Sequence, residues 1–106
     1  MEQDFKRIIT HYGVLPQLKY FQSEVFELNE AIIKYEDYYY ENYDDGIGKV
    51  DWTRWREHIA EEIADVCVML REFMAYYGIS QDEVAEIMEY KTKRQLRRIE
   101  DEIDNI

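Results

Sequence analysis

The sequence is poor in the residues that interrupt helices and in those that form disulfide-linked folds. Among 106 residues it has one proline, four glycines and one cysteine. So few prolines and glycines argue against a small β-sandwich, whose short strands need frequent turns, and they suit long helices. A single cysteine excludes a disulfide bond within the chain. The sequence contains no signal-peptide pattern and no apolar run of membrane-spanning length, so we expect a cytoplasmic protein.

Positive charge is also scarce. The chain has 13 Lys and Arg against 24 Asp and Glu, which gives a formal net charge of −11. Such a charge argues against binding to nucleic acid or to an anionic membrane, and it favours the collection of cations. Because 46% of the residues are hydrophobic, the chain can still bury a core. Its length is that of one domain, which we expect to span residues 1–106.

Apolar residues recur at spacings of three and four, which is the repeat of an amphipathic helix. The pattern predicts four helices, over residues 2–11, 15–39, 51–77 and 81 to near the C-terminus. Short connections between long helices favour antiparallel neighbours. We therefore expect an all-α fold, a four-helix antiparallel bundle with a short N-terminal helix.

Several residues mark the ends of these helices. Gly13 and Gly78 are stop signals for the first and third helices. Turn-forming residues indicate a loop over 40–50, and Asp51 is then the expected N-cap of the third helix. Ahead of the fourth helix, the run 80–83 has the pattern of a capping box.

Two of the predicted helices carry a pair of acidic residues three positions apart. Glu62 falls inside the apolar seam of the third helix, and Asp65 follows one turn later at the edge of that seam. Glu24 borders the seam of the second helix, and Glu27 follows it. If the helices pack side by side, the four carboxylates converge and repel one another unless a cation lies among them. An all-oxygen cluster suits Mg²⁺, or Mn²⁺, better than zinc; the alternative is that these acids are solvated.

The fourth helix carries the opposite charge. Its apolar side begins with Val84 and Ile87 and continues with basic residues: Lys91, Arg94 and Arg98. Lys and Arg are the usual partners of phosphate. The stripe is therefore a candidate phosphate-binding surface, and the alternative is that it pairs with acids of a neighbouring helix.

The order of these features resembles the MazG-like all-α nucleoside triphosphate pyrophosphohydrolases. Three stretches carry the resemblance: Gln17–Ile32, His58–Val66 and Glu86–Leu96. The second stretch, His-Ile-Ala-Glu-Glu-Ile-Ala-Asp-Val, is the most specific. Two features depart from the family pattern, a longer spacer between Glu27 and Glu62, and Glu89 where many relatives have asparagine.

The resemblance implies a Mg²⁺-dependent enzyme that hydrolyses a ribo- or deoxyribonucleoside triphosphate to the monophosphate and pyrophosphate by a metal-activated water. It implies the following metal ligands: Glu24, Glu27, Glu62 and Asp65. Lys91 and Arg94 would contact the substrate phosphates. Among the acids, Glu27 and Glu62 are the catalytic candidates, with Glu27 as the general base because it lies farthest from its helix seam.

Further apolar positions lie outside the predicted seams: Leu15, Phe26, Ile33 and Val68. Together with the seams they give more hydrophobic surface than one small bundle readily buries. Members of the family are typically dimers or tetramers, so we expect a homodimer or homotetramer. A second reading of the same surface is a non-catalytic helical protein that associates with itself or with a partner.

Overall fold

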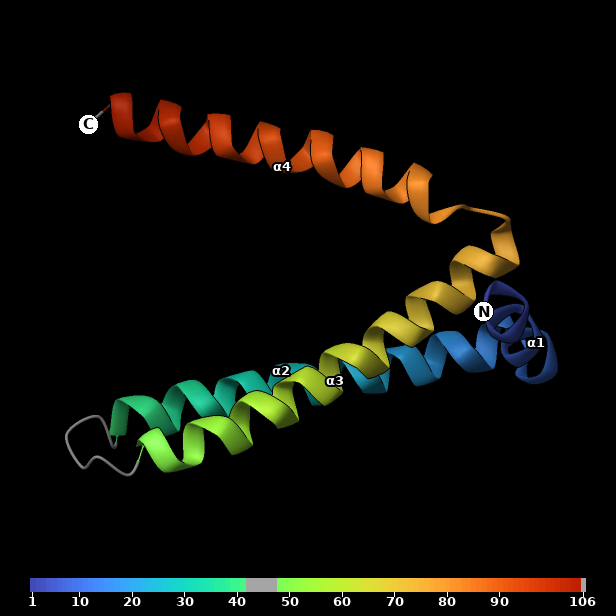
Figure 1. Cartoon of the computed structure of the whole chain (residues 1–106), viewed down its shortest axis with the longest axis horizontal. Coiled ribbons are helices and arrows are strands. Elements are labelled where there is room, and N and C mark those ends of the chain that lie inside the picture. Colours follow the sequence, from blue (N-terminus) through green and yellow to red (C-terminus); the bar gives the residue numbers. More distant parts are fainter. Residues whose placement is uncertain (42–47, 106) are drawn as a thin grey trace.

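The computed structural model of the chain consists of four α-helices (Figure 1). Their bounds are α1 Glu2–Tyr12, α2 Val14–Glu41, α3 Gly48–Tyr77 and α4 Gln81–Asp104. The structure describes residues 1–41 and 48–105, with side chains outside 38–52. No strand occurs in these ranges, and none of the described helices is long and apolar enough to cross a membrane. The predicted all-α class and the four helices are confirmed.

Most of the predicted helix ends are also confirmed. Gly13 ends α1 with φ 94°, and its N–H donates to the carbonyl of Ile9 at 2.8 Å. Gly78 follows α3 with φ 68°, in the left-handed region that glycine enters at little cost. The hydroxyl of Ser80 accepts a hydrogen bond from the N–H of Glu83 at 3.1 Å and caps α4.

The start of α3 differs from the prediction. The helix begins at Gly48, so Asp51 lies inside its first turn and is not the N-cap. The expected loop over 40–50 is helical at both of its ends, and residues 42–47 lie outside the described residues. A glycine in the first turn of a helix costs less than one in its middle, so Gly48 is compatible with the start of α3.

Helices α2 and α3 lie side by side and run in opposite directions (Figure 1). The rings of Phe21 and Phe73 meet edge to face across them, with centroids 5.7 Å apart. Further along the pair, Ala31 and Met69 are buried. Ala31 lies seven residues after Glu24 on α2, on the same face of that helix.

Helix α1 packs against the end of this pair where α2 begins and α3 ends (Figure 1). Its side chain Ile9 is fully buried. The guanidinium of Arg71 on α3 lies 4.9 Å from the ring centroid of Phe5, a cation–π contact one turn before Ile9 on the same face of α1. Helix α1 thus covers the apolar end of the α2–α3 pair.

Helix α4 stands apart from the other three within the single chain. It leaves the end of α3 and diverges from it, and it has no substantial packing contact with α1, α2 or α3 in the described residues (Figure 1). Its large apolar side chains are exposed: Ile87, Met88, Tyr90, Leu96, Ile99 and Ile103. Periodicity indicates which face of a helix is apolar, but not which surface covers that face.

Candidate metal-binding site

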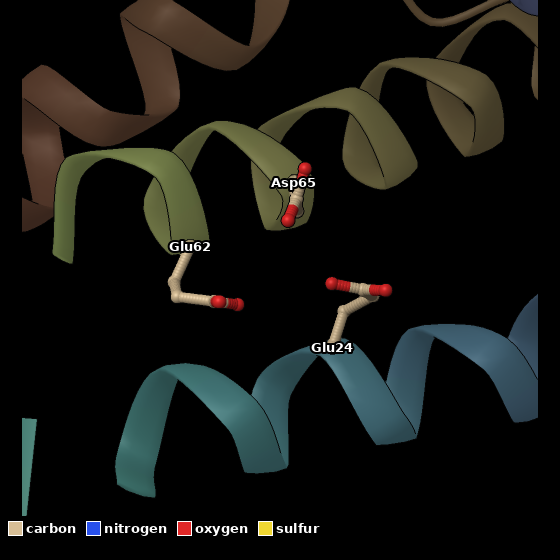
Figure 2. A group of neighbouring side chains, drawn as sticks. All are labelled: Glu24, Glu62 and Asp65. Carbon is tan, nitrogen blue, oxygen red and sulfur yellow. The ribbon is translucent and has the colours of Figure 1, made fainter. Parts of the chain in front are cut away.

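Three of the four acids predicted from the sequence meet between α2 and α3. One carboxylate oxygen from each of Glu24, Glu62 and Asp65 lies within 4.8 Å of the other two. Figure 2 shows Glu24 extending from α2 toward Glu62 and Asp65, which extend from α3. The three-residue spacing of Glu62 and Asp65 places both on the side of α3 that faces α2. We call these three residues the acid cluster.

The acid cluster is partly removed from water. Glu24 is buried, with an exposed fraction of 5%, while Glu62 is half-buried and Asp65 is exposed. Oε2 of Glu24 and Oε2 of Glu62 are buried and have no hydrogen-bond partner among the described residues. Leaving a carboxylate buried and unpaired costs several kcal/mol, a large part of the roughly 5–15 kcal/mol that stabilises a small domain. A divalent cation would offset this cost, and oxygen ligands alone suit Mg²⁺.

Tyr20 supplies a hydrogen bond to one member of the cluster. Its hydroxyl donates to the carboxylate of Glu24, one turn away on α2, and this hydrogen bond is the main reason that the pKa of Tyr20 is raised. The negative charge of Glu24 acts in the same direction. Oε2 of Glu24 has no hydrogen-bond partner among the described residues, and the side chain extends toward the other two acids (Figure 2).

Glu27, the fourth predicted ligand, is exposed and lies at the rim of the cluster. Its pKa is raised, first by the negative charge of Glu24, then by partial desolvation, and then by the charges of Glu62 and Asp65. The same charges that would hold a cation therefore act on Glu27. Its position beside the cluster, with one carboxylate open to solvent, is compatible with either a ligand or a general base.

We expect cation binding to lower the pKa of Glu27. A bound Mg²⁺ neutralises the acids that raise this pKa, so the titration midpoint of the Glu27 carboxyl carbon should fall when Mg²⁺ saturates the protein. NMR titration of side-chain carboxyl carbons measures this midpoint. Glu24→Gln should lower the same midpoint without any metal, because the charge of Glu24 is the largest cause of the raised pKa of Glu27. A midpoint that moves in Glu24→Gln but not with Mg²⁺ would show that the cluster does not bind the ion.

The same pKa fixes a pH dependence for the metal-free protein. Because the pKa of Glu27 is raised, the folded chain binds this proton more tightly than the unfolded chain does. The resulting stabilisation is fully present below the ordinary carboxyl pKa and is lost as the pH rises through the raised value. Mg²⁺ affinity should change in the opposite sense and fall as Glu27 takes up its proton.

The predicted phosphate contacts do not reach the acid cluster within one chain. Lys91 and Arg94 are exposed on α4, which diverges from α3 (Figure 1). Arg94 lies over the ring of Tyr90 at 5.9 Å. In the described part of the chain neither residue forms an ion pair with a carboxylate, whereas Lys93 pairs with Glu89 at 2.9 Å. The alternative in which Lys91 and Arg94 pair with acids of a neighbouring helix is thus not seen here.

A second buried polar pair lies near the cluster and was missed by the sequence reasoning. Nε2 of Gln17 donates a hydrogen bond to Oε1 of Glu72 at 2.6 Å, and both side chains are buried. A signal was present, because Gln17 precedes Glu24 by seven residues and Glu72 follows Asp65 by seven. Two helical turns separate the residues of each pair, so they share a face. In so acidic a chain, one more glutamate did not stand out.

Comparison with known proteins leaves this site to be interpreted from its own geometry. No family model matches the chain, and neither a curated protein nor a solved structure gives a significant match.

Proposed function

We propose that the chain is a Mg²⁺-dependent nucleoside triphosphate pyrophosphohydrolase of the MazG-like type. The observation that carries the proposal is that Glu24 and Glu62, which meet Asp65 between two helices, each have a buried carboxylate oxygen without a hydrogen-bond partner among the described residues. A purely structural pair of helices gains nothing from this arrangement, because each oxygen is desolvated without a compensating hydrogen bond.

The residues of the site fit a hard cation by their chemistry. Glu24, Glu62 and Asp65 offer oxygen ligands only, and Glu27 lies within range of their charge. A bound Mg²⁺ supplies neutralisation of the phosphate charge and acidification of a water ligand. In this proposal α2 and α3 supply the metal ligands. Tyr20 holds Glu24 in place through its hydrogen bond, and Glu27 accepts a proton from the attacking water.

The phosphate contacts require a second copy of the chain. Lys91 and Arg94 lie on a helix with no substantial packing against its own α1–α3 unit in the described residues. We propose that α4 of one copy packs on the α1–α3 unit of another, which would bring basic side chains to an acid cluster. Both surfaces have exposed apolar side chains, among them Phe26 on α2 and Leu96 on α4, at 62% and 54% exposure. Apolar area of this extent is typical of an interface.

We expect the protein to sediment as a dimer or larger assembly at micromolar concentration. Ile63 and Leu70 on α3 are each nearly half exposed, and Cys67 lies between them on the same face. If this face is an interface, Leu70→Glu should shift the particle to the monomer and speed reaction of Cys67 with a thiol reagent. A wild-type monomer with a fully reactive Cys67 would contradict the assembly.

The exposed apolar faces also favour the second reading, a helical protein that only self-associates. The two functions differ in what Mg²⁺ does. The enzyme should release pyrophosphate from a nucleoside triphosphate when Mg²⁺ is present and stop when a chelator is added. A protein that only self-associates should assemble with or without Mg²⁺ and release none from any member of a panel of ribo- and deoxyribonucleoside triphosphates.

A further inference from the structure

A cavity of about 620 Å³ opens between α1, α2 and α3 beside the acid cluster. Glu24 and Asp65 line it at one side, so the cavity and the cluster share a wall. Apolar lining comes from Ile8, Val68 and Met69. Predominantly apolar walls with a few fixed polar groups are typical of sites for small organic ligands.

Away from the cluster the cavity is lined by the hydrogen-bonded pair Gln17 and Glu72, and the tyrosines Tyr12 and Tyr20 also line it. The exposed fractions of Gln17 and Glu72 are 8% and 2%. Each lies seven residues along its helix from a member of the acid cluster, or about 10 Å at a rise of about 1.5 Å per residue. That separation is comparable with the length of a nucleoside from its base edge to its 5′ oxygen. A nucleotide with its phosphates at the cluster would therefore place its base against this pair.

The hydrogen-bonding capacity of the pair restricts which base fits. An ionised carboxylate only accepts hydrogen bonds, so Glu72 favours a donor and repels a carbonyl oxygen. Gln17 uses one N–H on Glu72 and keeps a second N–H to donate. The amino edge of cytosine or adenine matches this pattern, because its amino group donates to Glu72 and the adjacent ring nitrogen accepts from Gln17. Uracil and hypoxanthine present a carbonyl oxygen where those bases have the amino group.

We propose that this cavity is the nucleobase site and that Gln17 and Glu72 select bases whose exocyclic amino group faces Glu72. The inference rests on the proposed function for its substrate class. It adds a specificity that the acid cluster cannot supply, because the cluster would act only on phosphates and metal. Glu72 is a specificity residue here, since it contacts the base and not the reacting atoms.

Two pairs of nearly isosteric nucleotides test the selection: CTP against UTP, and ATP against ITP. Within each pair the principal change is an amino group replaced by a carbonyl oxygen. For the wild type we expect kcat/KM to favour the amino member of at least one pair by about tenfold or more, as for a hydrogen bond to a charged group. Glu72→Gln should bring that ratio close to one, because an amide can face either edge. Glu57→Gln, which removes an exposed charge from the same helix, should leave the ratio unchanged.

The ratio of kcat/KM between the two members of a pair shows whether Glu72 recognises the base or has only a structural role. If Glu72 only accepts the hydrogen bond from Gln17 and does not contact the base, then Glu72→Gln changes the melting temperature and leaves the ratio intact. That result would overturn the proposal. A wild type that treats both members of each pair alike, or that prefers UTP and ITP, would also overturn it. Should Glu72→Gln fail to fold, Gln17→Met removes the donor from the other side and should lower the same ratio.

Binding without turnover distinguishes this inference from the proposed function. Calorimetry with CMP and UMP, in the absence of Mg²⁺, measures the base site alone. Tighter binding of CMP with no hydrolysis of any triphosphate would overturn the enzyme and retain the base site. Hydrolysis of every triphosphate at one rate, with equal binding of CMP and UMP, would overturn the base site and retain the enzyme.

Discussion

Glu62→Gln is expected to lower Mg²⁺-dependent pyrophosphate release by more than about a hundredfold. Even residues that only support a metal ligand typically contribute about ten- to a hundredfold to affinity or activity, and Glu62 would be a ligand itself. The carboxylate that the amide replaces carries Oε2, a buried oxygen with no hydrogen-bond partner among the described residues. Steady-state kinetics, with Mg²⁺ titrated into wild type and variant by calorimetry, measures both effects.

The same substitution should raise the stability of the metal-free protein. An amide removes the repulsion that Glu62 exerts on Glu24 and Asp65, and about 1 kcal/mol corresponds to roughly 4–8 °C in the melting temperature of a domain of this size. Mg²⁺ should then stabilise the wild type and leave the variant unaffected. Glu57→Gln is the matched control, an exposed acid five residues earlier on α3. If Glu62→Gln keeps its activity and its Mg²⁺ response, the metal site lies elsewhere.

Lys91→Ala and Arg94→Ala are each expected to lower kcat/KM by about ten- to a hundredfold while Mg²⁺ binding survives. A charge-assisted hydrogen bond to phosphate contributes about 1.5–3 kcal/mol, and these side chains meet the charge of the substrate rather than that of the metal. Lys93→Ala is the matched control, because Lys93 lies on the same helix and pairs with Glu89. Loss of stability with unaltered kcat/KM would instead assign Lys91 and Arg94 a structural role.

A mixing experiment shows whether the phosphate contacts come from another copy. Glu62→Gln lacks an intact acid cluster, and Lys91→Ala lacks an intact phosphate contact. If α4 of one copy serves the cluster of another, mixed assemblies contain some sites with both parts and recover activity that neither variant has alone. No recovery after the variants have been unfolded and refolded together would mean that α4 serves its own chain.

The sequence predicted the acid cluster better than it predicted the packing around it. Glu62 was recognisable because it interrupts an apolar seam, and three-residue spacing then placed Asp65 beside it. Glu24 is more buried than its place at the edge of a seam indicated. Spacing along one helix fixes the face on which a residue lies, but burial depends on the partner helix, which no periodicity reports.

The position of α4 was beyond sequence reasoning for the same reason. Its apolar stripe from Val84 to Ile103 predicts a covered face, and within one chain that stripe is largely exposed. The pair of Gln17 and Glu72 shows a related limit. Each residue lies seven positions from a member of the acid cluster, which the sequence shows. The hydrogen bond between them forms only because α2 packs against α3, which the sequence does not show.

The most direct test of the account is hydrolysis of a nucleoside triphosphate in ¹⁸O-labelled water with Mg²⁺, followed by mass spectrometry of the products. We expect a nucleoside monophosphate and pyrophosphate, with the label in the monophosphate, because water attacks the α-phosphorus. Label in the pyrophosphate would place the attack on the β-phosphorus. Release of a diphosphate with inorganic phosphate, or no turnover of any triphosphate, would contradict the assignment of the acid cluster to this reaction.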